Sequence, residues 1–310
     1  MTTHTLTLAG GALGFNWLPV FVAREQGLFA RRGLQVELQR LGSVDKATQA
    51  VRSGAAQLAI TPPEGVIADA LGGGPLRLVA GNVNRLPLTL IAQPGIHNVR
   101  ELQGAVLGTS SLTEGTSIYT REMLAQHGLQ YPRDYSFAVV GVHPERWKAL
   151  QAGTISAALQ LVPLNFVAID AGFSALGEAS DAIPEIVFTA LVADGRWAAA
   201  HGTAVAELLG ALAEATTMLY DAAHDGVLLP LVAQVTQCDE PYARRALAYL
   251  REREVFARGL GIPSAALVRN ATAMVATGLL DPARVGDVAS AFDPTWLRAA
   301  GLAAQEHGHV

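Results

Sequence analysis

Three turns in the first half of the sequence carry side chains suited to binding a small polar molecule. Each follows a strand-like segment and precedes a helix-like one: Ser43-Val-Asp-Lys46, Thr61-Pro-Pro-Glu64 and Ser111-Leu-Thr-Glu114. Ser43 has the hydroxyl preferred at a helix N-cap, and the other two turns fit the capping box, in which a Glu reaches back to the backbone. Free N–H groups at a helix start favour a polar or anionic group. Because most capping boxes only start helices, a binding role requires several such turns to meet at one place.

A Gly-rich turn near the N-terminus leads into two further candidates. Gly10-Gly-Ala-Leu-Gly14 is followed closely by Asn16 and Trp17. We expect Asn16 to cap the next helix or to offer its amide to a ligand. We expect Trp17 to be a wall of a cleft, because the following residues already supply that helix with an apolar stripe. An exposed indole would cover a ring, a methylene chain or a cation; the alternative is that Trp17 is a core residue.

Familiar catalytic motifs are scarce. The Gly-rich turn fits neither a dinucleotide fingerprint nor a P-loop, and the sequence has no G-x-S-x-G or H-E-x-x-H motif. The single cysteine, Cys238, excludes an intrachain disulfide and a multi-cysteine metal site. His143, at a strand-to-helix turn, is one candidate acid or base. Glu64 and Glu114 would be others if desolvated, but helix capping explains them more simply. We therefore expect no catalytic residue, metal site or cofactor.

Composition places these turns in a large folded chain. The 310 residues are 50% hydrophobic and only 16% charged, whereas about 25% charged residues is typical, so the composition excludes a disordered protein. The net charge of −5 argues against a nucleic-acid partner, which would require a basic face. The longest apolar stretches are interrupted by Pro, Asn and Gln, so we expect no transmembrane helix.

The order of the segments predicts an α/β protein with two lobes. Strand-like and helix-like segments alternate over the first 190 residues in two series, and the remainder is helical. We expect residues 1–87 and 190–310 to form lobe one and residues 88–189 to form lobe two. In such sheets ligands bind at the carboxyl ends of the strands, which is where the three turns lie.

One long segment resembles a known family. Trp17-Leu-Pro-Val-Phe-Val-Ala-Arg-Glu-Gln-Gly-Leu-Phe-Ala-Arg-Arg-Gly-Leu-Gln-Val-Glu37 is similar to the opening of the ABC-transporter substrate-binding proteins for nitrate, sulfonates, taurine and thiamine-pyrimidine precursors. The similarity continues over residues 47–59, 99–104, 108–129, 149–158 and 292–297. The turn at 61–64 most resembles the pyrimidine-precursor branch. The sequence departs from the family at Val162-Pro-Leu-Asn165, where transport members often have an acidic residue and a Pro.

The resemblance implies a type II periplasmic-binding-protein fold, in which two α/β lobes enclose a ligand and the C-terminal region is helical. It implies a small-molecule ligand, a monomer and, if the protein is secreted, an ABC-transporter permease as partner. The start of the sequence has no basic region followed by an apolar stretch. We therefore expect a periplasmic location if a signal segment has been removed and a cytoplasmic one otherwise. The expected ligand-binding residues are Asn16, Trp17, Gly42, Ser43, Thr61, Glu64, Ser111, Thr113, Glu114, Gly115, Thr116 and Val162.

Our leading hypothesis is a non-enzymatic binder of a small organic molecule that is sulfonate-, carboxylate- or pyrimidine-like. Because Glu64 and Glu114 would repel an anion, we expect a zwitterionic, heteroaromatic or amino-bearing ligand rather than plain sulfate or nitrate. The alternative is an enzyme on the same scaffold, a decarboxylase or isomerase of an aromatic acid. The pyrimidine-making branch uses a His in its N-terminal turn and a cysteine cluster, and both are missing here. A ligand-sensing regulatory module is a third possibility.

Overall fold

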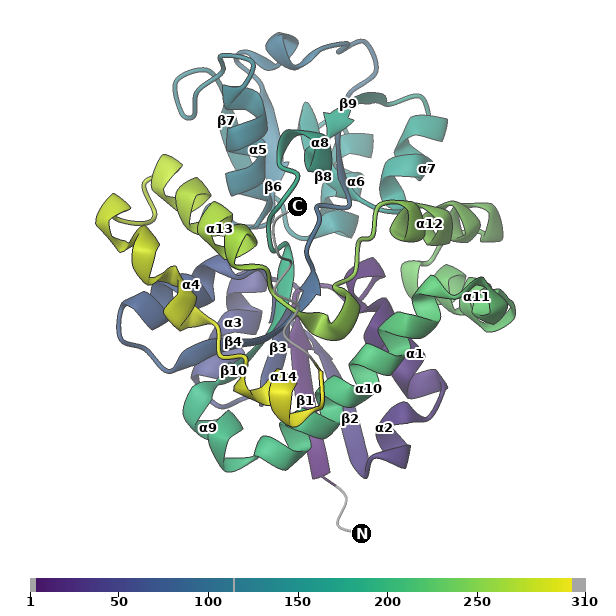
Figure 1. Cartoon of the computed structure of the whole chain (residues 1–310). Coiled ribbons are helices and arrows are strands. Elements are labelled where there is room, and N and C mark those ends of the chain that lie inside the picture. The colour runs from purple at the N-terminus through teal and green to yellow at the C-terminus, as the bar shows by residue number, and fades with distance from the viewer. Residues whose placement is uncertain (1–3, 114, 303–310) are drawn as a thin grey trace, which may run out of the picture.

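Two mixed β-sheets with helices packed against them make up the protein (Figure 1). The computed structural model describes residues 4–113 and 115–302. Within these residues the first sheet has the strand order β2-β1-β3-β10-β4 and the second has the order β7-β6-β8-β5-β9. This is the expected α/β architecture of a type II periplasmic-binding protein. The assignment of residues to lobes at 87/88 and 189/190 stays a prediction.

The first sheet is mainly built from the N-terminal segment. β1 pairs in parallel with β2 and β3, and β10 returns antiparallel between β3 and β4. Each residue of β3 is buried, as expected for a central strand that helices cover on both faces. The strands are β1 (His4–Gly10), β2 (Leu34–Arg40), β3 (Leu58–Thr61), β4 (Leu76–Val83) and β10 (Thr189–Asp194).

The second sheet repeats this plan. β6 is parallel to β7 and β8, whereas β5 is antiparallel to β8 and β9. The strands are β5 (Leu88–Ala92), β6 (Val106–Thr109), β7 (Ser136–Val139), β8 (Ala157–Leu161) and β9 (Ser174–Glu178). The chain passes between the sheets from β4 to β5 and from β9 to β10. The two passages are adjacent, since the Phe188 N–H donates to the Val83 carbonyl at 2.8 Å.

Helices follow most of the strands. The first series comprises η1 (Phe15–Trp17), α1 (Leu18–Glu25), α2 (Leu28–Arg31), α3 (Val44–Arg52) and α4 (Glu64–Leu71). The second comprises η2 (Val99–Leu102), α5 (Thr116–Ala125), α6 (His143–Gln151), α7 (Leu164–Asp170) and α8 (Ala179–Ala182). The C-terminal helices are α9 (Gly195–Ala200), α10 (Gly202–Tyr220), η3 (Ala222–His224), α11 (Asp225–Thr236), α12 (Glu240–Glu252), η4 (Arg258–Leu260), α13 (Ser264–Ala276), η5 (Pro282–Ala291) and α14 (Thr295–Ala299).

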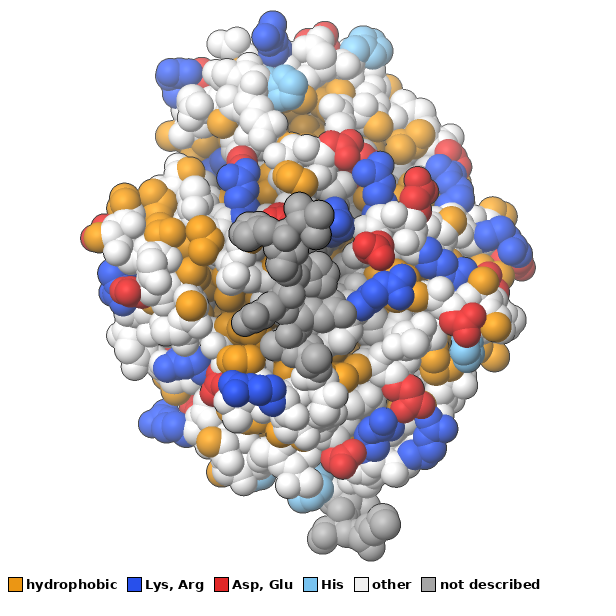
Figure 2. All heavy atoms as spheres, in the orientation of Figure 1, with side chains coloured by type: hydrophobic (Ala, Val, Ile, Leu, Met, Phe, Trp, Pro, Cys, Tyr) orange, Lys and Arg blue, Asp and Glu red, His pale blue; other side chains and the backbone are white. Residues whose placement is uncertain are grey.

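The C-terminal helices contact both sheet regions. α13 packs against α4 and α5 (Figure 1). On α12, Arg245 forms an ion pair with Asp170 of α7, and the Tyr249 hydroxyl donates to Glu178 of β9. Within the described residues no helix is long and apolar enough to cross a membrane. On the face drawn in Figure 2, described acidic and basic side chains are interspersed and form no large basic area, in keeping with the net charge of −5.

The three candidate turns fold differently from one another. Ser43 caps α3 as predicted, since its Oγ accepts from the Lys46 N–H at 3.4 Å. The capping box at 61–64 is wrong: Thr61 is the last residue of β3, and α4 begins at Glu64 after a Pro63 N-cap. The box at 111–114 is also wrong, because α5 begins only at Thr116, after Gly115. In both turns, Pro or Gly at the bend moves the helix start beyond the predicted cap.

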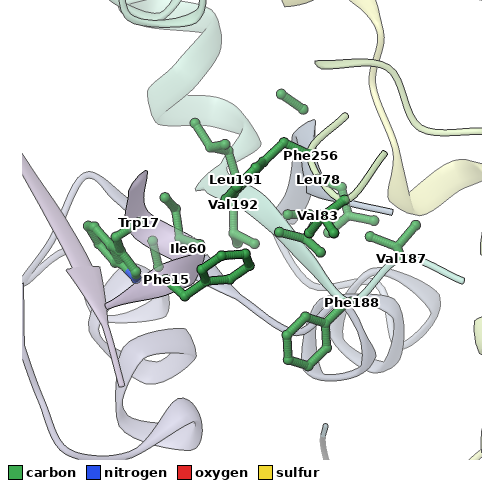
Figure 3. Packing of buried hydrophobic residues seen from close by; sticks show 14 of the residues in the cluster. Phe15, Trp17, Ile60, Leu78, Val83, Val187, Phe188, Leu191, Val192 and Phe256 are labelled. Atoms are coloured by element: carbon green, nitrogen blue, oxygen red, sulfur yellow. The ribbon is translucent and has the colours of Figure 1, made fainter. Parts of the chain in front are cut away.

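The predictions for Asn16 as a cap and for Trp17 as an exposed wall are wrong as well. Asn16 lies inside the short turn η1, and α1 begins at Leu18 without a side-chain cap. Trp17 is only 2% exposed and belongs to the hydrophobic core with Ile60 and Phe15 (Figure 3). Its ring lies so close to Gly10 that a Cβ there would be 2.2 Å from Cζ2. Strand β1 therefore needs glycine at that position to accommodate the indole.

Candidate functional site

A small cavity lies between the two sheets. It is lined by residues at strand ends and by the turns and helix starts next to them. We call it the inner cavity; its volume is about 60 Å³. The first-sheet side contributes Gly11, Ala12, Asn16, Trp17, Val44, Ile60 and Pro62. The second-sheet side contributes Leu88, Ser110, Gly115, Thr116, Val142, His143, Arg146 and Leu161, and the passage into β10 contributes Phe188 and Thr189. Most of these residues follow the ends of strands, where ligands bind in open α/β sheets.

Arg146 is the most informative residue of the inner cavity. It lies on α6, one turn before the buried Leu150, so helical spacing directs both side chains inward. Its side chain is 3% exposed, and its Nε and Nη1 donate to the carbonyls of Leu159 at 3.0 Å and Gly141 at 3.3 Å. No carboxylate among the described residues lies within 4 Å of it. Burial lowers the pKa of Arg146 to about 10, so the group is still a cation at pH 7.

A buried cation without a counter-ion is costly unless an anion completes the site. The polar groups around Arg146 suit such an anion. α5 and α6 both begin at the cavity, with Thr116 and His143 as their first residues, and helix N-termini attract negative charge. The hydroxyl of Thr116 lies 3.5 Å from that of Ser110, and both residues line the cavity. The arrangement is that of an oxyanion-binding site.

The first-sheet side adds an amide. Oδ1 of Asn16 is buried and has no hydrogen-bond partner among the described residues. The backbone carbonyl of Asn16 accepts from Asn82 Nδ2 at 2.8 Å, and the same nitrogen lies 3.0 Å from Oγ1 of Thr189. These bonds fix the Asn16 backbone at the cavity and leave its side-chain oxygen for a donor on a ligand.

His143 lies at the edge of the inner cavity. Burial, reinforced by the positive charges of Arg146 and Arg40, lowers the pKa of His143 to about 3. At neutral pH the imidazole is therefore uncharged. It packs against Gly14, where a Cβ would lie 3.2 Å from Nε2, so the Gly-rich turn allows the two sides of the cleft to approach closely.

Glu64 is held by other protein groups. Its Oε1 accepts from the Tyr119 hydroxyl at 2.9 Å and from Asn270 Nδ2 at 3.1 Å, and its Oε2 lies 3.5 Å from the Gly115 N–H. Glu64 is 1% exposed, and this burial raises the pKa of its carboxyl. The side chain links α4 to α5 and α13 and does not line the inner cavity.

The structure brings four of the predicted ligand-binding residues to the inner cavity: Asn16, Trp17, Gly115 and Thr116. The other predicted residues that the structure describes do not line it. The hydroxyls of Thr61 and Thr48 lie 3.3 Å apart. The Ser111 hydroxyl donates to Asp45, and its oxygen accepts from the Thr113 N–H. Gly42 and Ser43 precede α3, and Val162 lines an adjoining chamber. Glu114 lies outside the described residues. Ligand contact by all twelve residues stays a prediction.

Sequence reasoning missed Arg146, Ser110 and Thr189. The segment His143-Pro-Glu-Arg146 signals a helix start through its Pro. An Arg three residues into a helix nevertheless normally faces solvent. Only the packing of α6 against β8 shows that this one faces inward.

With this geometry in hand, comparison with known proteins identifies the family. The model of the NMT1/THI5-like family matches residues 14–222, more than half of the chain. The chain belongs to the NMT1/THI5-like family. The family match includes Asn16, Trp17 and Arg146 and both passages between the sheets. No curated protein matches the sequence of this NMT1/THI5-like protein.

Solved structures share the fold of this NMT1/THI5-like protein at low sequence identity. The alkanesulfonate-binding protein SsuA from Xanthomonas axonopodis pv. citri, bound to MOPS, has a TM-score of 0.77 and 17% identity, covering 93% of this chain and 98% of its own. The periplasmic nitrate-binding protein NrtA from Synechocystis PCC 6803 has a TM-score of 0.82 and 14% identity, covering 98% and 89%. The desulfurization enzyme DSZB is also similar, with a TM-score of 0.63 and 12% identity over 96% and 98%. The shared fold thus includes both solute binders and an enzyme.

Proposed function

We propose that this protein is a solute-binding protein that captures a small organic anion, a sulfonate or a carboxylate, and presents it to an ABC importer. The anion would pair with Arg146 in the inner cavity, enclosed between lobe one (residues 1–87 and 190–310) and lobe two (residues 88–189). The proposal includes a periplasmic location and a monomeric state.

The observation that carries the proposal is the buried Arg146, which has no carboxylate within 4 Å among the described residues. A sulfonate or carboxylate would supply the missing charge and would accept from the guanidinium in its fork geometry. The two helix N-termini and the Ser110 and Thr116 hydroxyls would bond its remaining oxygens. A pyrimidine-like ligand has less support, because Thr61 and Glu64 bond to other protein groups and do not line the cavity.

Contacts across the cleft support a closing motion. The Ser111 hydroxyl donates to Asp45 at 3.1 Å, and Arg40 pairs with Glu145 at 3.5 Å. Each contact joins a residue of the first-sheet side, Asp45 of α3 or Arg40 of β2, to a residue that follows a strand of the second sheet. A ligand that binds both sides would favour this closed arrangement over an open one.

A decarboxylase or isomerase would also bind an acid here, and the similarity to DSZB keeps this alternative relevant. Such an enzyme requires an acid or base whose pKa lies near the working pH. His143 lines the inner cavity but has a pKa of about 3. Glu64 does not reach the cavity. The described residues therefore favour binding over proton transfer.

Native mass spectrometry of the purified protein would show a co-purified acid as a mass increment. Isothermal titration calorimetry with short sulfonates and carboxylates would then compare the wild type with Arg146→Gln. Loss of a charge-assisted hydrogen bond costs about 1.5–3 kcal/mol, so we expect affinity to fall by roughly 10- to 150-fold. Arg100→Gln is the control, because Arg100 is exposed and lies on η2. Equal affinities for wild type and Arg146→Gln would refute the proposal.

A further inference from the structure

A second chamber adjoins the inner cavity. We call it the outer chamber; its volume is about 330 Å³, and it shares Ala12 and His143 with the inner cavity. Its walls come from the Gly-rich turn after β1, from α6, from the turn between β8 and α7, and from the end of α11. The inner cavity has room for a compact acidic group but not for a chain of several carbon atoms. A longer ligand held at Arg146 would therefore extend into the outer chamber.

The charged side chains of the outer chamber favour a second acidic group. Lys148 and Arg40 contribute two positive charges and Glu145 one negative charge, and His143 is neutral. Arg40 pairs with Glu145 at 3.5 Å, and both side chains are substantially exposed, so this ion pair is weak. Lys148 has no carboxylate within 4 Å among the described residues. The chamber thus has a net positive charge, and one of its cations, Lys148, is not paired with any carboxylate of the described part of the chain.

The wall of the outer chamber also offers an apolar side for a methylene chain. Trp147 lines it, and its ring packs edge-on against Phe173 with 5.0 Å between the ring centroids. This contact holds the indole in place, so a ligand would not have to order it. Pro163 and Leu164 line the same chamber.

We propose that the outer chamber is a second binding subsite and that the ligand is an elongated organic dianion. One acidic group pairs with Arg146 in the inner cavity, and the other lies near Lys148 in the outer chamber. This inference rests on the proposed function, because it takes Arg146 as the anchor of the first group.

Two matched pairs of compounds test the inference by calorimetry at about 0.15 M salt, where distant charges are screened. They are propane-1-sulfonate with propane-1,3-disulfonate, and butanoate with pentanedioate. We expect the dianion of at least one pair to bind about fivefold tighter or more than its monoanion. Lys148→Ala should remove most of this preference and leave the monoanion affinity within about twofold. Arg100→Ala, which removes an exposed cation on η2, should preserve the preference.

The outcomes separate this inference from the proposed function. The second subsite is refuted if neither dianion binds more tightly than its monoanion. It is also refuted if Lys148→Ala and Arg100→Ala change the preference for the dianion equally. If monoanions still bind and Arg146→Gln weakens them, the proposed function stands without it. If neither pair binds to the wild type, both proposals are refuted.

Discussion

The Tyr119 hydroxyl donates a hydrogen bond of 2.9 Å to Oε1 of Glu64. Tyr119 lies on α5, next to the second sheet, and Glu64 begins α4, next to the first sheet. Asn270 of α13 donates to the same oxygen and also bonds to both backbone groups of Val187, in the passage that leads into β10. The bond therefore belongs to a buried network that joins both sides of the cleft to the connection between them.

Tyr119→Phe should destabilise the folded protein. The substitution removes one donor from a buried carboxyl, which costs about 1–3 kcal/mol. Chemical denaturation would measure the loss in the free energy of unfolding. Tyr131→Phe is the control, because the Tyr131 hydroxyl has no hydrogen bond among the described residues. Equal effects of the two substitutions would show that the Tyr119–Glu64 bond contributes nothing specific.

Glu64→Gln should change the pH dependence of stability. Burial raises the pKa of the Glu64 carboxyl above its ordinary value of 4.5, so the folded state favours the protonated form. The stabilising contribution is complete below pH 4.5 and is lost as the pH rises through the folded-state pKa. Gln keeps an oxygen for Tyr119 but cannot ionise. The wild type should thus lose stability relative to Glu64→Gln as the pH rises, and a constant difference in unfolding free energy between pH 4 and 9 would contradict this.

His143→Gln should show that His143 affects the pH dependence of stability in the opposite direction to Glu64. The pKa of His143 falls to about 3 in the folded protein from an ordinary value of 6.5. Its contribution is complete above pH 6.5 and is lost as the pH falls toward 3, because the unfolded chain then binds a proton that the folded chain does not. Unfolding titrations should show the wild type losing stability relative to His143→Gln over that range. The exposed His97 provides the control substitution, His97→Gln.

Trp17→Ala should destabilise the protein strongly, in contrast to the small effect that a cleft wall would give. Trp17 is a core residue that also reaches the inner cavity, so truncation costs about 3–5 kcal/mol. Gly10→Ala should act through the same contact, because the new methyl group would overlap the indole. Denaturation curves of the two variants would check this. A loss below about 1 kcal/mol in Trp17→Ala would mean that its burial adds little.

The alternation of strand-like and helix-like segments is enough to predict the two-sheet architecture. Apolar runs and the Gly and Pro residues that bound them are local features, so they can be recognised in a single sequence. The N-cap role of Ser43 is confirmed for the same reason. The predicted starts of α4 and α5 are wrong, because a capping box cannot show that Thr61 continues β3 or that Gly115 delays the next helix. The burial of Trp17 and the role of Arg146 could not be predicted for a different reason. Which side of a helix faces the cleft depends on packing between the sheets, and a single sequence does not contain that information.

Arg146→Met should affect binding and stability with opposite signs. Because no described carboxylate lies within 4 Å of Arg146, the protein without ligand bears the cost of a buried charge. Replacing the guanidinium with an apolar side chain of similar length should raise the free energy of unfolding without ligand by about 1 kcal/mol. Anion binding, measured by calorimetry, should be lost. Arg251→Met is the matched control: Arg251 is paired with Asp225 and bonded to the Leu219 carbonyl, so its removal should lower stability and leave binding unchanged. If Arg146→Met also lowers stability, the main role of Arg146 is to support the fold through its hydrogen bonds to the carbonyls of Leu159 and Gly141, and not to bind an anion.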